Sequence, residues 1–209
     1  TLLVSVVVAV TLGVIAAARA GSVLDHAVML LAIVGFSAPV FVTGYAMALV
    51  FAVDLQWLPV QGYTKLAQGF GPFLSHLVLP SIALGLGYVA MIARITRASM
   101  LEVLAQDYIR TAYAKGMARQ EVLVVHALKN AAVPIVTVVG IGVALLISGV
   151  VVTETVFNIP GVGRLVVDAI TRRDYPIIQG VTLVFSAVYV FINLLVDLSY
   201  VLFDPRVRL

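Results

Sequence analysis

The sequence contains no cysteine and few charged residues, and both shortages narrow the classes of function that fit it. Without cysteine there are no disulfides, no thiol nucleophile and no cysteine-based metal site. Charged residues make up 11% of the 209 residues, whereas a soluble domain carries roughly 25%. The mean hydropathy is +1.13. We therefore expect this chain to use a lipid bilayer as the solvent for its apolar surface.

Several common catalytic motifs are missing as well. The sequence has no G-x-x-x-x-G-K-[ST] phosphate loop, no H-E-x-x-H and no G-x-S-x-G. The three histidines, His26, His76 and His126, are far apart. We expect a protein that is not an enzyme, with no cofactor, no metal site and no catalytic residue of its own. The net charge of +3 does not indicate nucleic acid, because Lys and Arg collect in the cytoplasmic loops of membrane proteins.

Five apolar segments are long enough to be considered membrane spans. A crossing helix needs about 20 apolar residues, and each backbone amide in lipid must be paired within the helix. Pro39 lies near the middle of the second segment and predicts a kink there, while Pro80 and Pro134 lie near the starts of later segments, where proline costs little. The sequence predicts a single all-α transmembrane domain over residues 1–209, with spans at about 1–18, 27–53, 76–93, 131–153 and 175–202.

The distribution of basic residues predicts the orientation of these spans. The first loop, the third loop and the tail together hold nine Lys and Arg residues, and the second and fourth loops hold four. The more basic set should be cytoplasmic. The N-terminal end of the chain is then external and the C-terminus is cytoplasmic. The larger set comprises Arg19, Arg94, Arg97, Arg110, Lys115, Arg119, Lys129, Arg206 and Arg208.

The third loop, residues 94–130, is called the basic segment below. It holds six Lys and Arg residues against three Asp and Glu. Ser99–Lys115 contains neither Gly nor Pro, which predicts one continuous helix. Gly116 should end that helix in a left-handed conformation, and a second short helix should follow over Arg119–Asn130. On spacing alone, an amphipathic helix lying on lipid headgroups remains an alternative.

The basic segment resembles the E-A-A-x-x-x-G loop of ABC-importer permeases. Arg110, Thr111 and Ala112 stand at the E-A-A positions, Gly116 at the glycine, and His126 and Leu128 at the later I and L. Arg110 replaces the acid, and Lys129 stands in place of the terminal proline. Both departures are similar to the dipeptide/oligopeptide/nickel branch of these permeases. Further matching stretches are Ile33–Phe41, Glu154–Gly180 and Phe203–Leu209.

The resemblance implies a multi-pass permease subunit of the bacterial or archaeal cytoplasmic membrane. It implies six membrane helices in the family, so that the first is expected to be absent from this chain. It also implies three kinds of protein partner: a second related permease, cytoplasmic ATPase subunits that bind ATP and Mg, and an extracytoplasmic substrate-binding protein. The implied ATPase contacts are Arg110, Thr111, Ala112, Lys115 and Gly116, and contacts to the binding protein are expected at Asn158, Gly161, Arg164, Arg172, Asp174 and Tyr175.

Two other classes of protein remain as alternatives. An ion-coupled secondary transporter usually keeps charged residues deep in the membrane, and Asp197 is the one acidic residue within the expected spans. A membrane scaffold without transport is the other alternative. Within the permease reading, the solute is left open among dipeptides, longer peptides, nickel chelates and glutathione.

Overall fold

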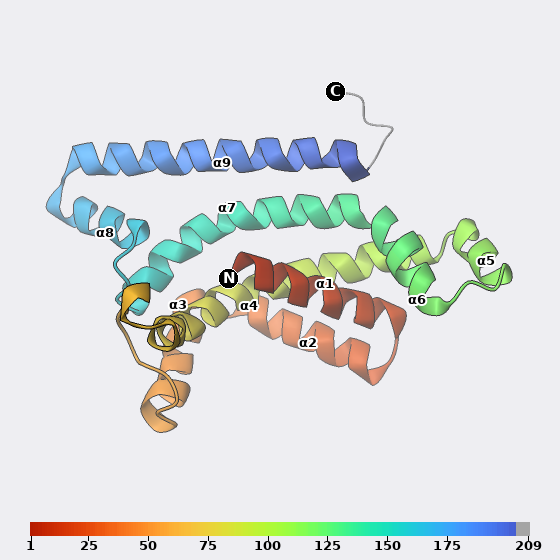
Figure 1. The fold of residues 1–209 in the computed structure, drawn as a ribbon, viewed down its shortest axis with the longest axis horizontal. Helices are drawn as coiled ribbons and strands as arrows, with labels where there is room; N and C mark the ends of the chain where they lie inside the picture. Colours follow the sequence, from red (N-terminus) through yellow and green to blue (C-terminus); the bar gives the residue numbers. More distant parts are fainter. Residues whose placement is uncertain (204–209) are drawn as a thin grey trace. The chain divides into compact units, whose positions relative to one another are not determined.

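The computed structural model describes residues 1–203, and within this range the chain forms helices and turns without strands (Figure 1). The prediction of an all-helical protein is confirmed. The helices are α1 (Leu2–Ala18), α2 (Val23–Ser37), α3 (Val40–Met47), the π-helix η1 (Ala48–Asp54), the 3-10 helix η2 (Leu66–Gln68), α4 (Phe70–Leu104), α5 (Asp107–Ala114), α6 (Arg119–Glu121), the π-helix η3 (Val122–Leu128), α7 (Ala132–Val156), α8 (Val162–Arg172) and α9 (Tyr175–Phe203).

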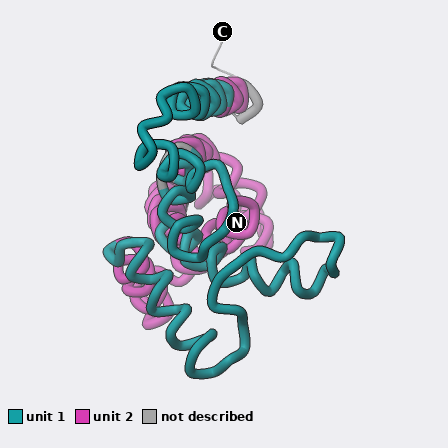
Figure 2. Tube along the Cα trace, turned by 90° about the vertical axis from the view of Figure 1, so that its left-hand side faces the viewer, with its two compact units in different colours: residues 1, 37–87, 143–191 teal, residues 2–36, 88–142, 192–209 magenta. Residues whose placement is uncertain are grey.

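The chain divides into two compact units, coloured separately in Figure 2. Unit 1 consists of residue 1 and residues 37–87 and 143–191, and unit 2 of residues 2–36, 88–142 and 192–209. Unit 2 contains both loops that the basic residues predict to be cytoplasmic, and unit 1 contains both loops predicted to be external.

Helices long and apolar enough to cross a membrane are present among the described residues. Phe70–Leu104 and Tyr175–Tyr200 qualify by themselves. Two bent pairs qualify if each is counted as one span: Val23–Ser37 with Val40–Asp54, and Arg119–Leu128 with Ala132–Val143. Leu2–Ala18 is a shorter apolar helix. Length and composition thus give two to four crossing segments, and the number five stays a prediction.

The expected kink at Pro39 is a complete break between helices. The pair Val23–Ser37 and Val40–Asp54 is bent by 104°. Pro39 has no amide hydrogen to donate and takes an extended backbone, with φ −58° and ψ 140°. Its carbonyl accepts the N–H of Thr43 at 3.1 Å and the Thr43 hydroxyl at 2.9 Å. Pro39 therefore starts a new helix.

Two boundary predictions are wrong. Pro80 lies inside α4, because this helix already begins at Phe70. The continuous helix expected over Ser99–Lys115 is broken, since α4 ends at Leu104 and α5 begins at Asp107. Gln106 between them is extended. The break allows Ile109 of α5 to join Met100 of α4 in one buried cluster, whereas in a continuous helix a nine-residue separation would place them about 13 Å apart along the axis.

Candidate functional site

The basic segment folds as a helix, a glycine turn and a second helix. The N–H of Gly116 donates to the Tyr113 carbonyl at 2.9 Å, and the N–H of Met117 donates to the Ala112 carbonyl at 3.3 Å. These two bonds form a Schellman motif at the end of α5. Gly116 has φ +80°, a conformation that is costly for residues with a Cβ. The left-handed glycine is confirmed, and so is the helix that follows from Arg119, although most of that helix is the π-helix η3.

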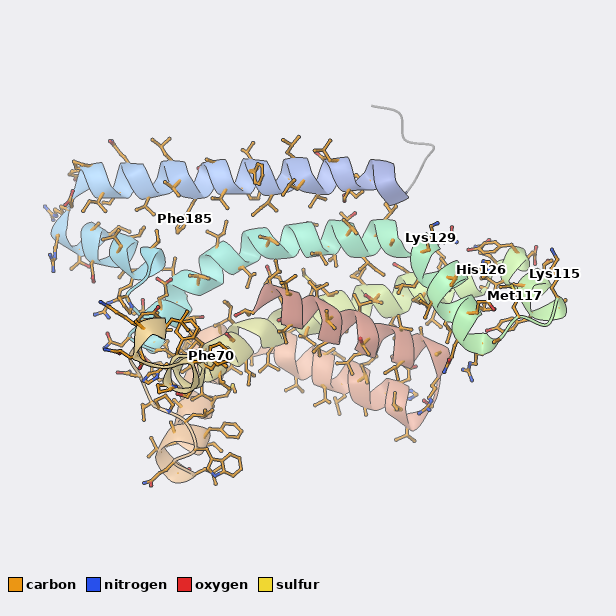
Figure 3. All side chains as sticks on the ribbon, viewed as in Figure 1. Phe70, Lys115, Met117, His126, Lys129 and Phe185 are labelled. Carbon is orange, nitrogen blue, oxygen red and sulfur yellow. The ribbon has the colours of Figure 1, made fainter. Side chains whose placement is uncertain are left out.

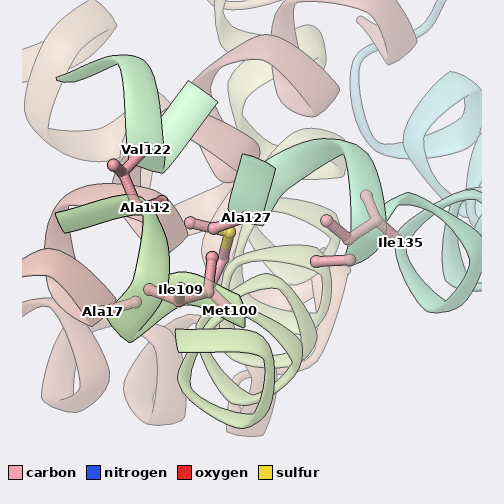
Figure 4. Close-up of a cluster of buried hydrophobic side chains, with 8 residues drawn as sticks. Ala17, Met100, Ile109, Ala112, Val122, Ala127 and Ile135 are labelled. Carbon is pink, nitrogen blue, oxygen red and sulfur yellow. The ribbon is translucent and has the colours of Figure 1, made fainter. Parts of the chain in front are cut away.

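The inner face of this segment is fixed by apolar packing within unit 2 (Figure 4). Ile109 is 1% exposed and Ala112 is 7% exposed. The segment's second helix contributes Val122 and Ala127 to the same cluster. Because α1, α4 and α7 also supply members, α5 is held as part of a common core rather than as a free loop. The remaining members of this cluster are Ala17, Met100, Ala131 and Ile135.

The outer face carries most of the residues that the sequence predicts for partner contact. Arg110, Thr111, Lys115 and Gly116 are exposed, and Figure 3 marks Lys115 on this segment. Ala112 is different, because it lies in the buried cluster and its side chain is covered by the chain itself. The structure therefore brings four of the five predicted residues together on one accessible stretch and places the fifth beneath them.

Two tyrosines border the exposed positions. Tyr108 and Tyr113 are each 44% exposed, so each ring offers apolar area together with a hydroxyl. Partial burial raises the pKa of the Tyr108 phenol, which leaves it a neutral hydrogen-bonding group. The Asp107–Arg110 ion pair is long, at 3.7 Å, and both side chains are well exposed. Such a pair contributes little to stability, and Arg110 is available to a partner.

The later motif positions lie on the second helix of the segment. His126 and Leu128 belong to η3 and are half-buried, and Leu128 packs against the cluster. Lys129 follows them and is exposed. Figure 3 marks His126 and Lys129 on this part of the chain. The side-chain amide of Asn130 donates to the His126 carbonyl at 2.6 Å. This bond links η3 to the short connection that precedes α7.

Among the described residues of unit 2, the most buried charged side chain is one that was not predicted from the sequence. Asp25 is 1% exposed, and its carboxylate accepts two hydrogen bonds from the Arg97 guanidinium, at 2.5 and 2.6 Å. Sequence reasoning treated Arg97 only as one of several loop cations. Asp25 lies just before an apolar run, and an acid at such a position normally indicates the first turn of a helix. The only sequence signal was an acid and a base flanking two spans on the same predicted side.

The predicted external segment is organised around Glu154 in unit 1. One Glu154 carboxylate oxygen accepts the N–H of Arg164 at 2.9 Å, in the first turn of α8. Gly161 and Gly163 allow this close approach, because a Cβ on Gly161 would collide with the Glu154 carboxylate and one on Gly163 would lie 2.6 Å from the Val151 Cα. A carboxylate at a helix N-terminus is favourable. Glu154 was missed as a site residue, although it opens the motif at Glu154–Gly180.

The residues expected to meet an external protein lie at the two ends of α8. Arg164 donates to the Asn158 side-chain carbonyl and is 3.9 Å from Asp168. The structure thus joins Asn158, Gly161 and Arg164 at one end. Arg172, Asp174 and Tyr175 lie at the other end, where Arg173 is left-handed with φ 58°. There, an Asp174 carboxylate oxygen accepts the N–H of Ile177 at 3.3 Å and caps α9.

Two predicted features lie outside the described residues. The motif at Phe203–Leu209 extends beyond residue 203, and the two tail arginines, Arg206 and Arg208, follow that residue. The orientation of the C-terminus therefore stays a prediction. Asp197 lies in α9, within the described part of the chain.

Comparison with known proteins shows the class to which this architecture belongs. Residues 9–209 match the family described as binding-protein-dependent transport system inner membrane component. The chain belongs to this family, which is the one that the basic segment resembles. The family's description thus names an inner membrane component of a transport system that depends on a binding protein.

Three similar proteins have names that refer to peptide transport. The chain is 58% identical over 208 residues to a probable peptide ABC transporter permease protein of Sinorhizobium fredii, covering 100% of this chain and 66% of the relative. It is 44% identical to the di/tripeptide transport system permease protein of Pseudomonas aeruginosa, covering 94% and 64%. It is 42% identical to the dipeptide transport system permease protein of Escherichia coli K12, covering 96% and 66%. The chain spans slightly less than two thirds of the length of these relatives.

Proposed function

We propose that this protein is a permease subunit of an ATP-driven importer that receives di- or oligopeptides from a substrate-binding protein. Family membership supports the transport role, and the names of the three relatives support peptides as the solute. ATP and Mg would be bound by separate ATPase subunits, because the sequence contains no phosphate loop.

The arrangement of the basic segment is the observation that carries this proposal. The apolar side of α5 is buried in the chain's own core, and the exposed side presents Arg110, Thr111 and Lys115 beside Gly116. A short helix that is anchored in a packed core can transmit a displacement caused by a partner, because packed cores do not deform continuously. We propose that an ATPase subunit binds this exposed side and that ATP-driven closure moves it. Ala112 would act from beneath, by holding the contact surface in place.

The membrane arrangement follows from the same proposal. The five apolar segments would cross the cytoplasmic membrane, with α1 as the first crossing despite its 17 residues. The basic segment and the C-terminus would be cytoplasmic, in agreement with the Lys and Arg count. A second related permease subunit would complete the translocation pathway. The many exposed apolar side chains of α9, from Leu183 to Leu198, would then face lipid or that second subunit.

The segment around α8 would meet the substrate-binding protein on the opposite side. At its beginning, exposed Asn158 and half-buried Arg164 are joined by a hydrogen bond. Arg172 and Tyr175 at its end are also exposed. The glycines and Glu154 beneath hold the helix in a fixed position, which a docking surface requires.

A substitution at Gly116 tests the proposal. Valine at a residue with φ +80° costs on the order of 1–2 kcal/mol and should deform the Schellman turn. Nothing lies within 4 Å of an added Cβ, so the effect is conformational and not a clash. We expect Gly116→Val to insert normally, to bind the ATPase weakly and to lose most peptide uptake per ATP hydrolysed. Uptake of a radiolabelled dipeptide and phosphate release would be measured in proteoliposomes containing the assembled transporter.

Two variants serve as controls for this experiment. Gly116→Asn should retain more activity, because asparagine tolerates the left-handed conformation. Gly180→Val should behave like the wild type, because Gly180 has open space around it without a left-handed backbone. Normal coupled uptake by Gly116→Val would contradict the proposed role of the segment. Uptake that collapses with an ionophore at constant ATP, and with Asp197→Asn, would instead identify an ion-coupled transporter.

A further inference from the structure

The turn between α1 and α2 is built around the carboxylate of Asp25. The N–H of Gly21 donates to its Oδ2 atom at 2.9 Å, and the N–H of Asp25 itself donates to the Ser22 hydroxyl at 3.3 Å. Gly21 has φ +78°, which turns its N–H back toward the start of α2. With the two bonds from Arg97, the carboxylate accepts three hydrogen bonds. Its charge is therefore fully matched within unit 2.

The ion pair attaches α2 to α4, together with the Arg94 guanidinium, which lies 5.8 Å from the centroid of the Phe36 ring. Asp25 and Ala32 are the buried residues of this helix, so α2 has little apolar packing of its own. A cavity of about 410 Å³ lies beside the pair and is lined by Asp25, His26, Met29, Leu30, Ile33 and Arg97. Because this cavity replaces close packing, the guanidinium–carboxylate contact carries much of the connection between α2 and α4.

The same hairpin is joined to the basic segment at two further points. The Arg119 side chain donates to the Ala18 carbonyl at the end of α1. Ala17 is a member of the buried cluster that holds Ile109 and Ala112. Along α1, Gly13 lies so close to α4 that an added Cβ would be 2.6 Å from the Thr96 Cβ. The α1–α2 hairpin is thus connected both to α4, next to Arg97, and to the helix pair on either side of Gly116.

The burial and the geometry of the ion pair favour a contact that stays closed. The Asp25 side chain is 2% exposed and that of Arg97 is 27% exposed, so opening the pair would leave a buried carboxylate with the Gly21 N–H and without a cationic partner. Breaking one side of a buried pair is strongly unfavourable. The planar guanidinium binds both carboxylate oxygens at once and fixes the relative orientation of the two groups. A displacement of one of the two helices is therefore passed directly to the other.

We infer that Asp25 and Arg97 are positioning residues that make the α1–α2 hairpin move together with the basic segment during the transport cycle. The inference rests on the proposed function, since it assigns the contacts through which a displacement of α5 by the ATPase is transmitted to α2. Neither residue belongs to the proposed ATPase contact surface. Their role is to keep α2 in step with α4, whose C-terminal end leads directly into α5.

The test uses the assembled transporter in proteoliposomes and compares uptake of radiolabelled dialanine with ATP hydrolysis. Asp25→Asn removes one charge and one acceptor from the Arg97 fork. It should leave co-purification of the ATPase subunits intact and lower peptide imported per ATP about tenfold, the scale expected for a residue within a coupling network. Glu102→Gln is the matched control, because it neutralises an exposed acid on the same helix as Arg97. It should retain wild-type coupling.

Two further variants separate positioning from stability. Arg97→Lys keeps the charge and loses the two-pronged geometry, so it should accumulate normally and show an intermediate loss of coupling. The double variant Asp25→Asn with Arg97→Gln restores a neutral, hydrogen-bonding pair and should recover part of the coupling that Asp25→Asn loses. If Asp25→Asn does not accumulate in the membrane, Arg97→Lys carries the same comparison.

Each outcome decides the inference. Reduced uptake per ATP at an unchanged protein level supports it, and so does partial rescue in the double variant. Unchanged coupling in Asp25→Asn or Arg97→Lys, or a loss of protein with normal uptake per remaining molecule, would overturn it. A wild-type transporter that neither binds ATPase subunits nor responds to ATP would instead overturn the proposed function, and the two failures are therefore distinguishable.

Discussion

Two short helices of this protein, α5 and α8, have similar positions in the chain and opposite means of attachment. Each follows a long helix, and a left-handed residue comes shortly after the end of each, Gly116 with φ +80° and Arg173 with φ 58°. Helix α5 is attached by apolar side chains, Ile109 and Ala112, that enter a buried cluster. Helix α8 is attached at its first turn by the Glu154 carboxylate, and it buries only the small residues Gly163 and Ala169.

The difference determines which side chains are left for partners. Because α5 is held by apolar contacts, its charged and hydroxyl side chains need no internal partner beyond weak or local ones, such as the 3.7 Å pair of Arg110 with Asp107. In α8, Arg164 is engaged by Asn158 and lies near Asp168. The exposed side of α5 therefore suits a strong contact of defined geometry. The surface of α8 suits weaker docking, in which its internal pairs are replaced by pairs with the partner.

The largest effect is expected from placing a charge beneath α5, because this would disrupt its apolar attachment. Ala112→Asp would bury a carboxylate among Met100, Val122 and Ala127, at a cost of about 3 kcal/mol or more. We expect rapid proteolysis within the basic segment and a clearly lower unfolding temperature in detergent. Ala114→Asp, on the exposed side of the same helix, should change neither. Equal stability of the two variants would show that the cluster does not hold α5.

A smaller effect is expected from crowding the contact beneath α8. In Gly163→Ala the new Cβ would lie 2.6 Å from the Val151 Cα, and overpacking of this kind costs about 1–3 kcal/mol. The segment should become more sensitive to protease, while ATPase binding at the basic segment stays unchanged. Gly180→Ala adds the same methyl group in open space and is the control. Protection of the segment equal to that of the wild type would argue against fixed docking of α8.

The smallest effect should come from removing the charge of Glu154 while keeping its shape. Glu154→Gln retains an acceptor for the Arg164 N–H and loses the favourable interaction with the helix N-terminus, worth about 0.3–1 kcal/mol. We expect a slight fall in unfolding temperature, and a larger fall for Glu154→Ala, which also removes the hydrogen bond. If both variants matched the wild type, the attachment of α8 would have to come from the packing of its small buried residues, Gly163 and Ala169.

The sequence was informative where a single residue determines the backbone. Gly116 and Pro39 act through their own covalent geometry, so a left-handed turn and a helix break could be predicted without knowing their surroundings. The composition likewise predicted helices and a membrane environment. Four of the five expected contact residues of α5 are exposed, because their positions follow from the helix period once the turn is known.

What the sequence did not predict depends on contacts between distant residues. The break between Leu104 and Asp107 places Ile109 in a cluster, and local propensity in that stretch favours an uninterrupted helix. The contact of Ala112 with an ATPase subunit stays a prediction, and the buried cluster places its side chain beneath the exposed residues. The Asp25–Arg97 pair joins residues 72 positions apart, and a period of 3.6 residues cannot reveal such a partner.

That separation has a consequence for how the protein is made. Asp25 leaves the ribosome well before Arg97, so during synthesis the first hairpin carries an acid without its base. An unpaired carboxylate is costly to bury, so until α4 is made the start of α2 should remain in contact with water. The hairpin can therefore reach its final packing only after the following long helix has been made, because that helix carries Arg97.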